Sequence, residues 1–394
     1  MTEYTENGLI FTLSEDGRGY SVRAENDHIT EAYVPTEYNG IPILWLEDRA
    51  FCGCELLKDV YLPSGIDYVP NEAFRNCTSL TNVSLPTKCR GIHEHAFSEC
   101  SSLAEINLPA TLFSIEYCAF SGCSSLTEIA LPREVTVSAW AFMGCKGLKR
   151  ISFPADLRFI SKGMLSGCSS IEEIILPESV TEIYDWAFSG CSALKRIDMP
   201  GVVKLDSWAF HGCTSLECIT LPKNVEGLSS HVFDGCKRLK LADIKGSIGC
   251  IDTGAFADCP SLEEVRFGPF REPKKVTEFD EYTGRFVTRE HISFVYPAVW
   301  KNAFFGCDSL STITVPESLI IIEERAFCEC RNLSSVALPK SICSIRSEAF
   351  FGCSRLSLII YDGTVEEWGK IQKHPQWSVG MQSVTVRCSD GIAQ

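Results

Sequence analysis

The sequence of this 394-residue chain predicts a repeat solenoid, in which about thirteen β-coils stack and carry a ladder of short parallel strands. Two observations predict this fold. The dipeptide Ala-Phe, followed three residues after the Phe by Cys, recurs along the chain at a step of 22 or 23 residues. A unit of that length has no room for both a sheet and a full helix, so each unit forms one coil and buries its apolar face against its neighbours.

Thirteen units follow this pattern, and Met164-Leu165 and Val232-Phe233 are the two variants of the dipeptide. The step is 22 residues before Ala141 and before Ala209, and one step of 48 residues holds an insertion of 25. The units begin at Ala50, Ala73, Ala96, Ala119, Ala141, Met164, Ala187, Ala209, Val232, Ala255, Ala303, Ala326 and Ala349.

Within each unit, the apolar positions predict where the strand lies. The unit that starts at Ala96 follows the pattern A-F-x-x-C-x-x-L-x-x-I-x-L-P-x-x-V-x-x-I. Apolar spacings of three, three and two fit neither a helical stripe nor simple strand alternation. The segment L-x-x-I-x-L matches the strand core of a leucine-rich repeat, so we expect the parallel strands there.

These motifs resemble the leucine-rich repeat subclass of the BspA-like proteins. The resemblance covers about residues 29 to 361, and the flanking segments also resemble the caps of that family. It implies a right-handed solenoid and roles in surface adhesion and protein binding. It implies no catalytic residues.

Both ends of the chain are expected to form caps, because the terminal coils of a solenoid must be covered. Leu9–Leu13 and Tyr20–Val22 flank a Gly-bearing turn and predict a β-hairpin. Residues 29–35 predict a degenerate strand. Near the other end, Thr364 to Glu367 form a capping box that opens a short helix, and Ser383–Val386 predict a last strand. The expected organisation is a cap over 1–48, a solenoid over 49–361 with an insertion at 271–301, and a cap over 362–394.

Composition and charge exclude several classes of protein. Hydrophobic residues make up 45% and charged residues 22% of the chain, which is normal for a globular protein. The net charge of −15 disfavours nucleic acids and anionic membranes, because such a field repels phosphate. No apolar run reaches 18 residues, so membrane insertion is not expected.

Thirteen of the 21 cysteines occupy the repeat position, three residues after the Phe. We expect them to form one buried column of reduced thiols, whose weak S–H donors meet turn carbonyls. Parallel side chains in one column have the wrong Cβ directions for disulfides. The fragments Cys52/Cys54 and Cys328/Cys330 lie too many coils apart to share one tetrahedral metal site.

No catalytic, cofactor or metal site is predicted. None of the seven histidines lies in an H-E-x-x-H or nucleophile-elbow context, and the glycines before the repeat cysteines indicate turns. The outward residues of the L-x-x-I-x-L segment form a mixed, acid-leaning surface with little aromatic area. Either solubility or a protein-binding face explains that surface.

A second column, directly before each Ala-Phe, holds polar residues at both ends of the array but Trp140, Trp186 and Trp208 in its middle. Tryptophan is enriched in interface hot spots, so these residues are candidates for partner binding. The alternative is that the indole rings lie flat against the coil edge as packing.

The insertion between Phe270 and Ala303 is the other departure from the repeat. Its aromatic residues alternate with charges around a Gly-bearing turn, which predicts a protruding hairpin. Insertions in repeat arrays often lie on the binding face, so Phe279, Tyr282 and Phe286 join the candidate partner-binding residues. A tolerated decoration of the loop remains the alternative.

The sequence therefore predicts a non-catalytic scaffold for protein–protein interaction, with another protein as its partner. The alternative is a cell-surface adhesin that binds a host matrix protein or a glycan. The start of the chain lacks the basic and apolar regions of a secretory signal, and unpaired cysteines suit a reducing compartment, which favours the cytoplasm. The family resemblance instead implies export to a cell surface.

Overall fold

The structure is a computed structural model that describes residues 3–269, 275–280, 285–290, 297–381 and 383–393. These residues divide into two compact units. The first contains residues 1–201 and 209–215, and the second contains 202–208 and 216–394. The boundary runs through two successive coils, those that start at Ala187 and at Ala209, because each of them contributes residues to both units.

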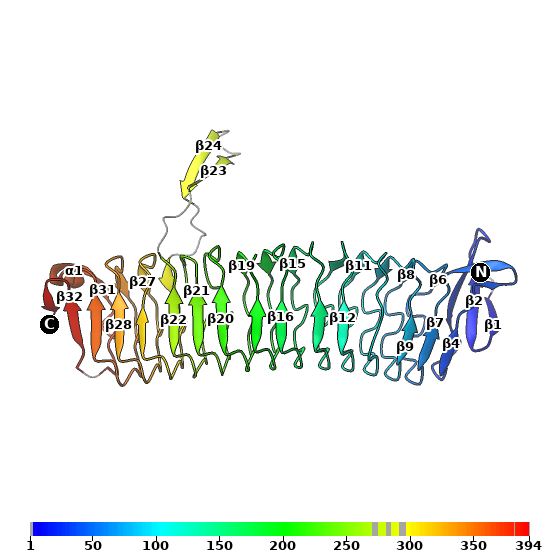
Figure 1. Cartoon of the computed structure of the whole chain (residues 1–394), viewed down its shortest axis with the longest axis horizontal. Coiled ribbons are helices and arrows are strands. Elements are labelled where there is room, and N and C mark those ends of the chain that lie inside the picture. The colour runs from blue at the N-terminus through cyan, green and yellow to red at the C-terminus, as the bar shows by residue number, and fades with distance from the viewer. Residues whose placement is uncertain (1–2, 270–274, 281–284, 291–296, 382, 394) are drawn as a thin grey trace. The chain divides into compact units, whose positions relative to one another are not determined.

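The first unit contains a ladder of short parallel strands at the predicted L-x-x-I-x-L segments (Figure 1). The coil from Ala96 is the exception, because its residues 105–107 are not in a strand. The ladder also begins one turn before the first Ala-Phe unit, since Glu31–Tyr33 pairs in parallel with Asp59–Tyr61. Its strands are β4 (Glu31–Tyr33), β7 (Asp59–Tyr61), β9 (Asn82–Ser84), β12 (Glu128–Ala130), β14 (Arg150–Ser152), β16 (Glu173–Ile175) and β18 (Arg196–Asp198).

A second parallel ladder, which was not predicted, runs through the V-x-x-I part of each coil. Its strands are only two residues long, and the outward residue precedes a buried Val or Ile. Among the described strands, the sheet β8–β10–β11–β13 ends at β13, and a new one starts at β15. The strands of the first unit are β8 (Tyr68–Val69), β10 (Gly91–Ile92), β11 (Ser114–Ile115), β13 (Thr136–Val137), β15 (Phe159–Ile160) and β17 (Glu182–Ile183).

The second unit repeats the two-ladder plan and adds a turn beyond the last Ala-Phe unit, where β32 pairs in parallel with β30. Together with the extra turn at β4, this gives about 15 turns, two more than the thirteen Ala-Phe units. The first-ladder strands are β20 (Cys218–Leu221), β21 (Leu241–Ile244), β22 (Glu264–Phe267), β26 (Thr312–Thr314), β28 (Ser335–Leu338), β30 (Leu358–Tyr361) and β32 (Thr385–Cys388). The second-ladder strands are β19 (Lys204–Leu205), β25 (Ala298–Val299), β27 (Ile321–Ile322), β29 (Ser344–Ile345) and β31 (Gln372–Lys373).

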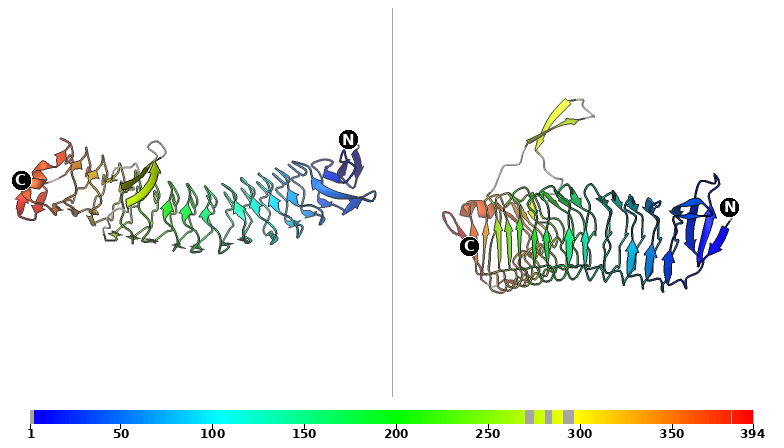
Figure 2. Two further views of the ribbon diagram at one scale, coloured as in Figure 1. Left: turned by 90° about the horizontal axis from the view of Figure 1, so that it is seen from above. Right: turned by 45° about the vertical axis from the view of Figure 1, so that its right-hand side comes forward.

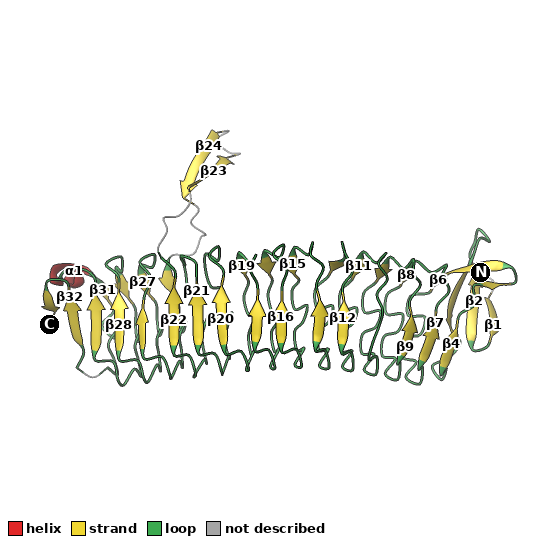
Figure 3. Cartoon of the chain, in the orientation of Figure 1, coloured by secondary structure: helices red, strands yellow, loops and turns green. Residues whose placement is uncertain are grey.

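The ends of the chain contain the elements that the sequence predicted. The strands of the N-terminal sheet are β1 (Glu3–Glu6), β2 (Leu9–Leu13), β3 (Tyr20–Ala24), β5 (Glu37–Tyr38) and β6 (Ile41–Leu46). The predicted hairpin is β2 paired with β3. Near the C-terminus, helix α1 (Val365–Lys370) begins at the N-cap Thr364, which forms a capping box with Glu367 (Figure 3). Strand β33 (Gly391–Ala393) then pairs antiparallel with β32.

The coils of each unit repeat a similar backbone path (Figure 2), and the core is built from columns of buried side chains that repeat from coil to coil. In the first unit, Phe74, Phe97 and Phe120 are fully buried and stack with ring centroids 5.2 and 5.3 Å apart. In the second unit, Phe256 stacks on Phe304 at 5.3 Å although the insertion separates them in sequence. The insertion therefore leaves the coil register intact.

The repeat cysteines form the buried column that the sequence predicted, and all thirteen are buried. The Cys100 thiol lies 3.0 Å from the carbonyl oxygen of Phe74, one coil back, and donates to it. The same bond recurs, for example from Cys191 to the carbonyl of Leu165 at 3.2 Å. The thiol is a second donor to this carbonyl, because the carbonyl oxygen of Phe74 also accepts the N–H of Cys77 at 3.1 Å.

Each coil also has two residues in the left-handed region of backbone space. The first directly precedes the Ala-Phe dipeptide and the second directly precedes the repeat Cys, and all thirteen coils follow this rule. Glycine occupies the second position in nine coils, as the predicted turns require, but the first position in only two, Gly163 and Gly254. A left-handed conformation costs a residue with a β-carbon about 1–2 kcal/mol.

Hydrogen bonds along the array accompany this turn geometry. In one coil, the N–H groups of Glu72, Phe74 and Asn76 donate to carbonyl oxygens of the following coil at 2.7–2.9 Å. Two of these three donors are the left-handed residues. The turn is therefore a third hydrogen-bonded seam between coils, in addition to the two strand ladders.

The insertion contains a hairpin, as predicted. Strands β23 (Lys275–Asp280) and β24 (Arg285–Glu290) pair antiparallel, with Phe279 opposite Phe286. Residues 270–274, 281–284 and 291–296, and with them Tyr282, lie outside the described residues.

Candidate binding surfaces

The structure brings two of the predicted tryptophans together in the first unit. Trp140 and Trp186 both occupy the left-handed position before Ala-Phe, with φ of 61° and 55°. Both are half-buried, and their rings stack with centroids 6.1 Å apart. The coil between them carries Gly163, and a β-carbon added there would overlap the indole ring of Trp140. The Nζ of Lys162 lies 4.8 Å from the ring centroid of Trp186. These packing contacts therefore bury part of the surface of each indole ring.

Trp208 lies in the second unit and has a different neighbour. Its φ is 62°, and its ring stacks on the imidazole of His231 at 4.0 Å with an angle of 9° between the planes. The Nδ1 of His231 lies 3.0 Å from an Asp234 carboxylate oxygen. A β-carbon at Gly254 would approach the His231 ring to 2.5 Å. Both tryptophan stacks therefore use the same arrangement, in which a ring at the left-handed position lies over a glycine.

The candidate residues of the insertion are only partly placed by the structure. The register of β23 and β24 sets Phe279 and Phe286 at facing positions of the hairpin. Tyr282 belongs to the part of the chain that is not described. A partner-binding role for the tryptophans and the insertion residues is therefore a proposal.

The second ladder of the first unit carries an exposed aromatic surface that the sequence analysis missed. We call Tyr68, His93, Phe113, Phe159 and Tyr184 the aromatic face. Tyr68, Phe113 and Phe159 are 36%, 43% and 40% exposed. The ring of Tyr68 lies 5.3 Å from His93, and Phe159 lies 5.5 Å from Tyr184. In both pairs the second residue follows the first by 25 positions, so the arrangement repeats between coils.

At one end of the aromatic face, two rings pack edge to face. Phe113 lies edge-on to Tyr68 with ring centroids 6.3 Å apart, and the guanidinium of Arg90 lies 5.5 Å from the Phe113 centroid. Other coils carry small or polar residues at the outward strand position, namely Gly91, Ser114, Thr136 and Glu182. Aromatic residues in the variable positions of V-x-x-I are the sequence signal that could have indicated this surface.

Beside Phe159, the coils that start at Ala119 and Ala141 are separated by a groove of about 160 Å³. The first of these coils is one residue short, since Val135 and Val137 are two residues apart where Leu112 and Ile115 are three apart. The second ladder breaks here, because among the described strands β13 does not pair with β15. The shorter coil thus leaves open the space that a continuous ladder would close.

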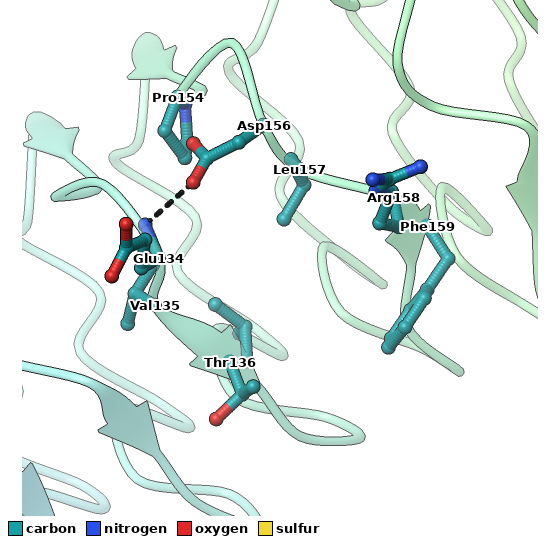
Figure 4. A pocket seen from close by; sticks show the side chains of 9 residues that line it. Glu134, Val135, Thr136, Pro154, Asp156, Leu157, Arg158 and Phe159 are labelled. Atoms are coloured by element: carbon teal, nitrogen blue, oxygen red, sulfur yellow. Dashed lines mark hydrogen bonds between the residues drawn. The ribbon is translucent and has the colours of Figure 1, made fainter.

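One carboxylate in this groove makes a hydrogen bond between the two coils (Figure 4). Asp156 reaches across to the neighbouring coil, where its Oδ2 accepts the N–H of Glu134 at 2.9 Å. Its Oδ1 is buried and has no hydrogen-bond partner among the described residues. The apolar lining comes from Val135, Val137, Pro154, Leu157 and Phe159.

The described residues offer little for metal or thiolate chemistry. Within the described ranges, no group of three or more His, Cys, Asp or Glu side chains could hold a metal ion. All 21 cysteines are thiols. Burial raises the pKa of Cys145 and of Cys191 to about 12, so both thiols stay protonated at neutral pH. None of the described helices is long and apolar enough to cross a membrane.

Coils of 22 or 23 residues with parallel strands and columns of Leu and Ile define a leucine-rich repeat protein. The chain belongs to the family of the BspA type leucine-rich repeat region, whose six-copy model matches residues 45–172, 158–283 and 296–372. No curated protein matches the sequence of this chain.

Several solved structures share the fold. A leucine-rich repeat protein from Bacteroides ovatus is 23% identical with a TM-score of 0.69, and the alignment covers 98% of this chain and 99% of that one. A leucine-rich cell surface protein from Faecalibacterium prausnitzii is 25% identical with a TM-score of 0.57, over 94% and 98%. The pneumococcal vaccine antigen PcpA is 17% identical with a TM-score of 0.50, over 96% and 89%. This chain is therefore a leucine-rich repeat scaffold.

Proposed function

We propose that this chain is a non-catalytic scaffold that binds another protein through the outer surface of its coils. The aromatic face is the observation that carries the proposal. Three of its rings are more than a third exposed, although neighbouring coils fill the same positions with small or polar residues. Since the fold does not need aromatic residues there, their exposure favours a role in contact with a partner.

The residues singled out from the sequence belong to the same proposal. Trp186 follows Tyr184 of the aromatic face by two residues, at the turn that continues from the second ladder. Trp140 and Trp186 keep part of their surface open, and tryptophan at a left-handed position is costly for the backbone. We extend the binding surface to these two residues, and we treat Trp208, Phe279, Tyr282 and Phe286 as further contact residues.

The test replaces aromatic residues by residues that the same columns hold in other coils. The triple variant combines Tyr68→Ser, Phe113→Thr and Phe159→Thr. In other coils, the corresponding positions hold Ser114, Thr181 and Thr136. A matched control, Tyr61→Ser with Ile175→Thr, removes exposed apolar surface from the first ladder instead. Cell lysate and surface extract are passed over each immobilised protein, and a captured protein is then titrated against all variants.

The expected result is that the aromatic-face variant weakens binding of the captured protein by about tenfold or more, whereas the control changes it little. Both variants should keep the melting temperature of the wild type, because every replaced side chain is exposed. Equal binding by all three proteins would contradict the proposal. Binding of glycans without any protein ligand would favour the adhesin alternative.

A further inference from the structure

The groove between the coils of Ala119 and Ala141 has a defined chemical character. Its walls are apolar on both sides, with Val135 and Val137 from one coil and Pro154, Leu157 and Phe159 from the next. The polar residues of the lining are Glu134, Thr136, Asp156 and Arg158, and the Oδ1 of Asp156 is buried without a partner in the described structure. Leaving a buried carboxylate oxygen without a donor is unfavourable, so the site favours a ligand that brings one.

The charge around the groove favours a cation over a neutral donor. Glu134 adds a second carboxylate to the lining, and the chain carries a net charge of −15. Arg158 also lines the groove, but no ion pair joins its guanidinium to Asp156 in the described part of the chain, and its side chain is exposed. The negative charge of Asp156 is therefore not neutralised by a direct partner.

Phe159 favours a guanidinium over an ammonium group as the cation. Its ring is 40% exposed and belongs to both the groove lining and the aromatic face. A guanidinium can donate to a carboxylate while its flat face stacks on an aromatic ring, and its alkyl stem suits apolar walls. An ammonium group can do the first but lacks the flat face.

We infer that this groove is a pocket for an arginine side chain of the protein partner. The guanidinium would donate to Oδ1 of Asp156 and stack on Phe159, and the alkyl stem would lie between Val135 and Leu157. This inference deepens the proposed function and rests on it, since it names the chemistry of a partner residue that docks beside the aromatic face. Arginine is also among the residues most enriched in interface hot spots.

The test uses a probe that needs no knowledge of the partner. N-acetyl-arginine amide is titrated into the full chain with labelled Leu and Val methyl groups, so that Val135, Val137 and Leu157 report on the groove. N-acetyl-citrulline amide has nearly the same shape without the charge, and N-acetyl-lysine amide carries a charge without the planar group. A dissociation constant on the order of millimolar is expected for so small a probe.

Two variants complete the experiment. Asp156→Asn keeps an acceptor for the Glu134 N–H and removes the charge, and Glu128→Gln removes an exposed charge from the first ladder as a control. We expect the arginine probe to shift the three groove residues, with Asp156→Asn weakening the probe about tenfold and Glu128→Gln leaving it unchanged. Citrulline should cause no saturable shift, and lysine should bind more weakly than arginine.

The inference is overturned if the arginine probe shifts no groove methyl group, if citrulline binds equally, or if Asp156→Asn binds as the wild type does. A saccharide that saturates the same methyl shifts in place of arginine would also overturn it. None of these outcomes depends on the aromatic-face variant described above. A failure here is therefore distinguishable from a failure of the proposed protein-binding function.

Discussion

The indole ring of Trp140 occupies the space that Gly163, one coil later, leaves open for lack of a side chain. Gly163 itself has a φ of 58°, so its backbone conformation and the neighbouring ring both require glycine. The backbone favours glycine at a left-handed position, and the neighbouring ring leaves no room for a β-carbon. The same two demands meet at Gly254, whose absent side chain would contact the ring of His231.

We predict that Gly163→Ala destabilises the first unit through the clash with Trp140. The expected loss is about 2–4 kcal/mol, made up of left-handed strain and overpacking. In Trp140→Gly the clash is absent, so Gly163→Ala should then cost only about 1–2 kcal/mol. Urea denaturation of the wild type, the two single variants and the double variant measures the coupling free energy between the two substitutions. A cost of Gly163→Ala that is the same in both backgrounds would show that the ring simply moves aside.

The second prediction concerns the column of stacked phenylalanines. Phe97 is fully buried between Phe74 and Phe120, so Phe97→Ala should cost about 3–5 kcal/mol by leaving a cavity. Damage should extend to the adjoining coils, because each coil is stabilised by its neighbours. Thermal denaturation and amide hydrogen exchange measure both effects. Phe113→Ala is the control, since the exposed ring of Phe113 should contribute little to the free energy of unfolding.

Much of this fold follows from the repeat, because each coil repeats the same burial pattern. The columns of Phe97, Cys100 and Leu103 could be predicted since every coil places a similar residue at the same point. The second ladder could not, because a strand of two residues such as Gly91–Ile92 leaves no alternation to detect. The left-handed position before Ala-Phe was likewise hidden, since residues as different as Glu72 and Trp186 occupy it.

The candidate site was less predictable for a physical reason. Trp140 and Trp186 stand out in the sequence because most other residues of their column are polar. Their packing across Gly163, however, depends on contacts between three coils. The groove at Asp156 arises from a one-residue deletion, which the sequence does reveal. The effect of the deletion on the second ladder depends on how the two coils separate in space. The spacing of residues in the sequence does not indicate this separation.

The third prediction is a loss of stability at alkaline pH that originates in the thiol column. Burial raises the pKa of Cys145 and Cys191 to about 12, whereas an unfolded thiol has a pKa of about 8.5. Between these values the unfolded chain releases protons that the folded chain keeps. Each such thiol therefore lowers the free energy of unfolding by about 1.4 kcal/mol per pH unit above about pH 8.5, and has no effect below it.

Urea denaturation at several pH values between 7 and 10 checks this expectation. The free energy of unfolding should be level up to about pH 8 and then fall steeply, because many thiols act together. In Cys145→Ala the fall should be shallower by about 1.4 kcal/mol per pH unit. Cys218→Ala is the control, since Cys218 is exposed. Equal slopes for Cys145→Ala and the wild type would mean that the buried thiols do not control the alkaline transition.

The last prediction concerns the tryptophans and the hairpin as contact residues of the partner. The first variant, Trp186→Gly with Trp208→Gly, places at two left-handed positions the residue that this column already holds at Gly163 and Gly254. The second variant deletes residues 274–290, which include β23 and β24. Neither should abolish folding, because glycine suits the left-handed backbone and the stack of Phe256 on Phe304 shows that the coils keep register across the insertion.

Binding of an identified partner should weaken about tenfold or more in each variant if both regions contact it. The circular dichroism spectrum should remain that of the wild type, and the melting temperature of the tryptophan variant should fall by a few degrees through the lost ring stacking. Because the two regions are changed separately, unchanged affinity in one variant removes that region alone from the binding surface. Unchanged affinity in both, with the aromatic-face variant still defective, would restrict the partner to the second ladder of the first unit.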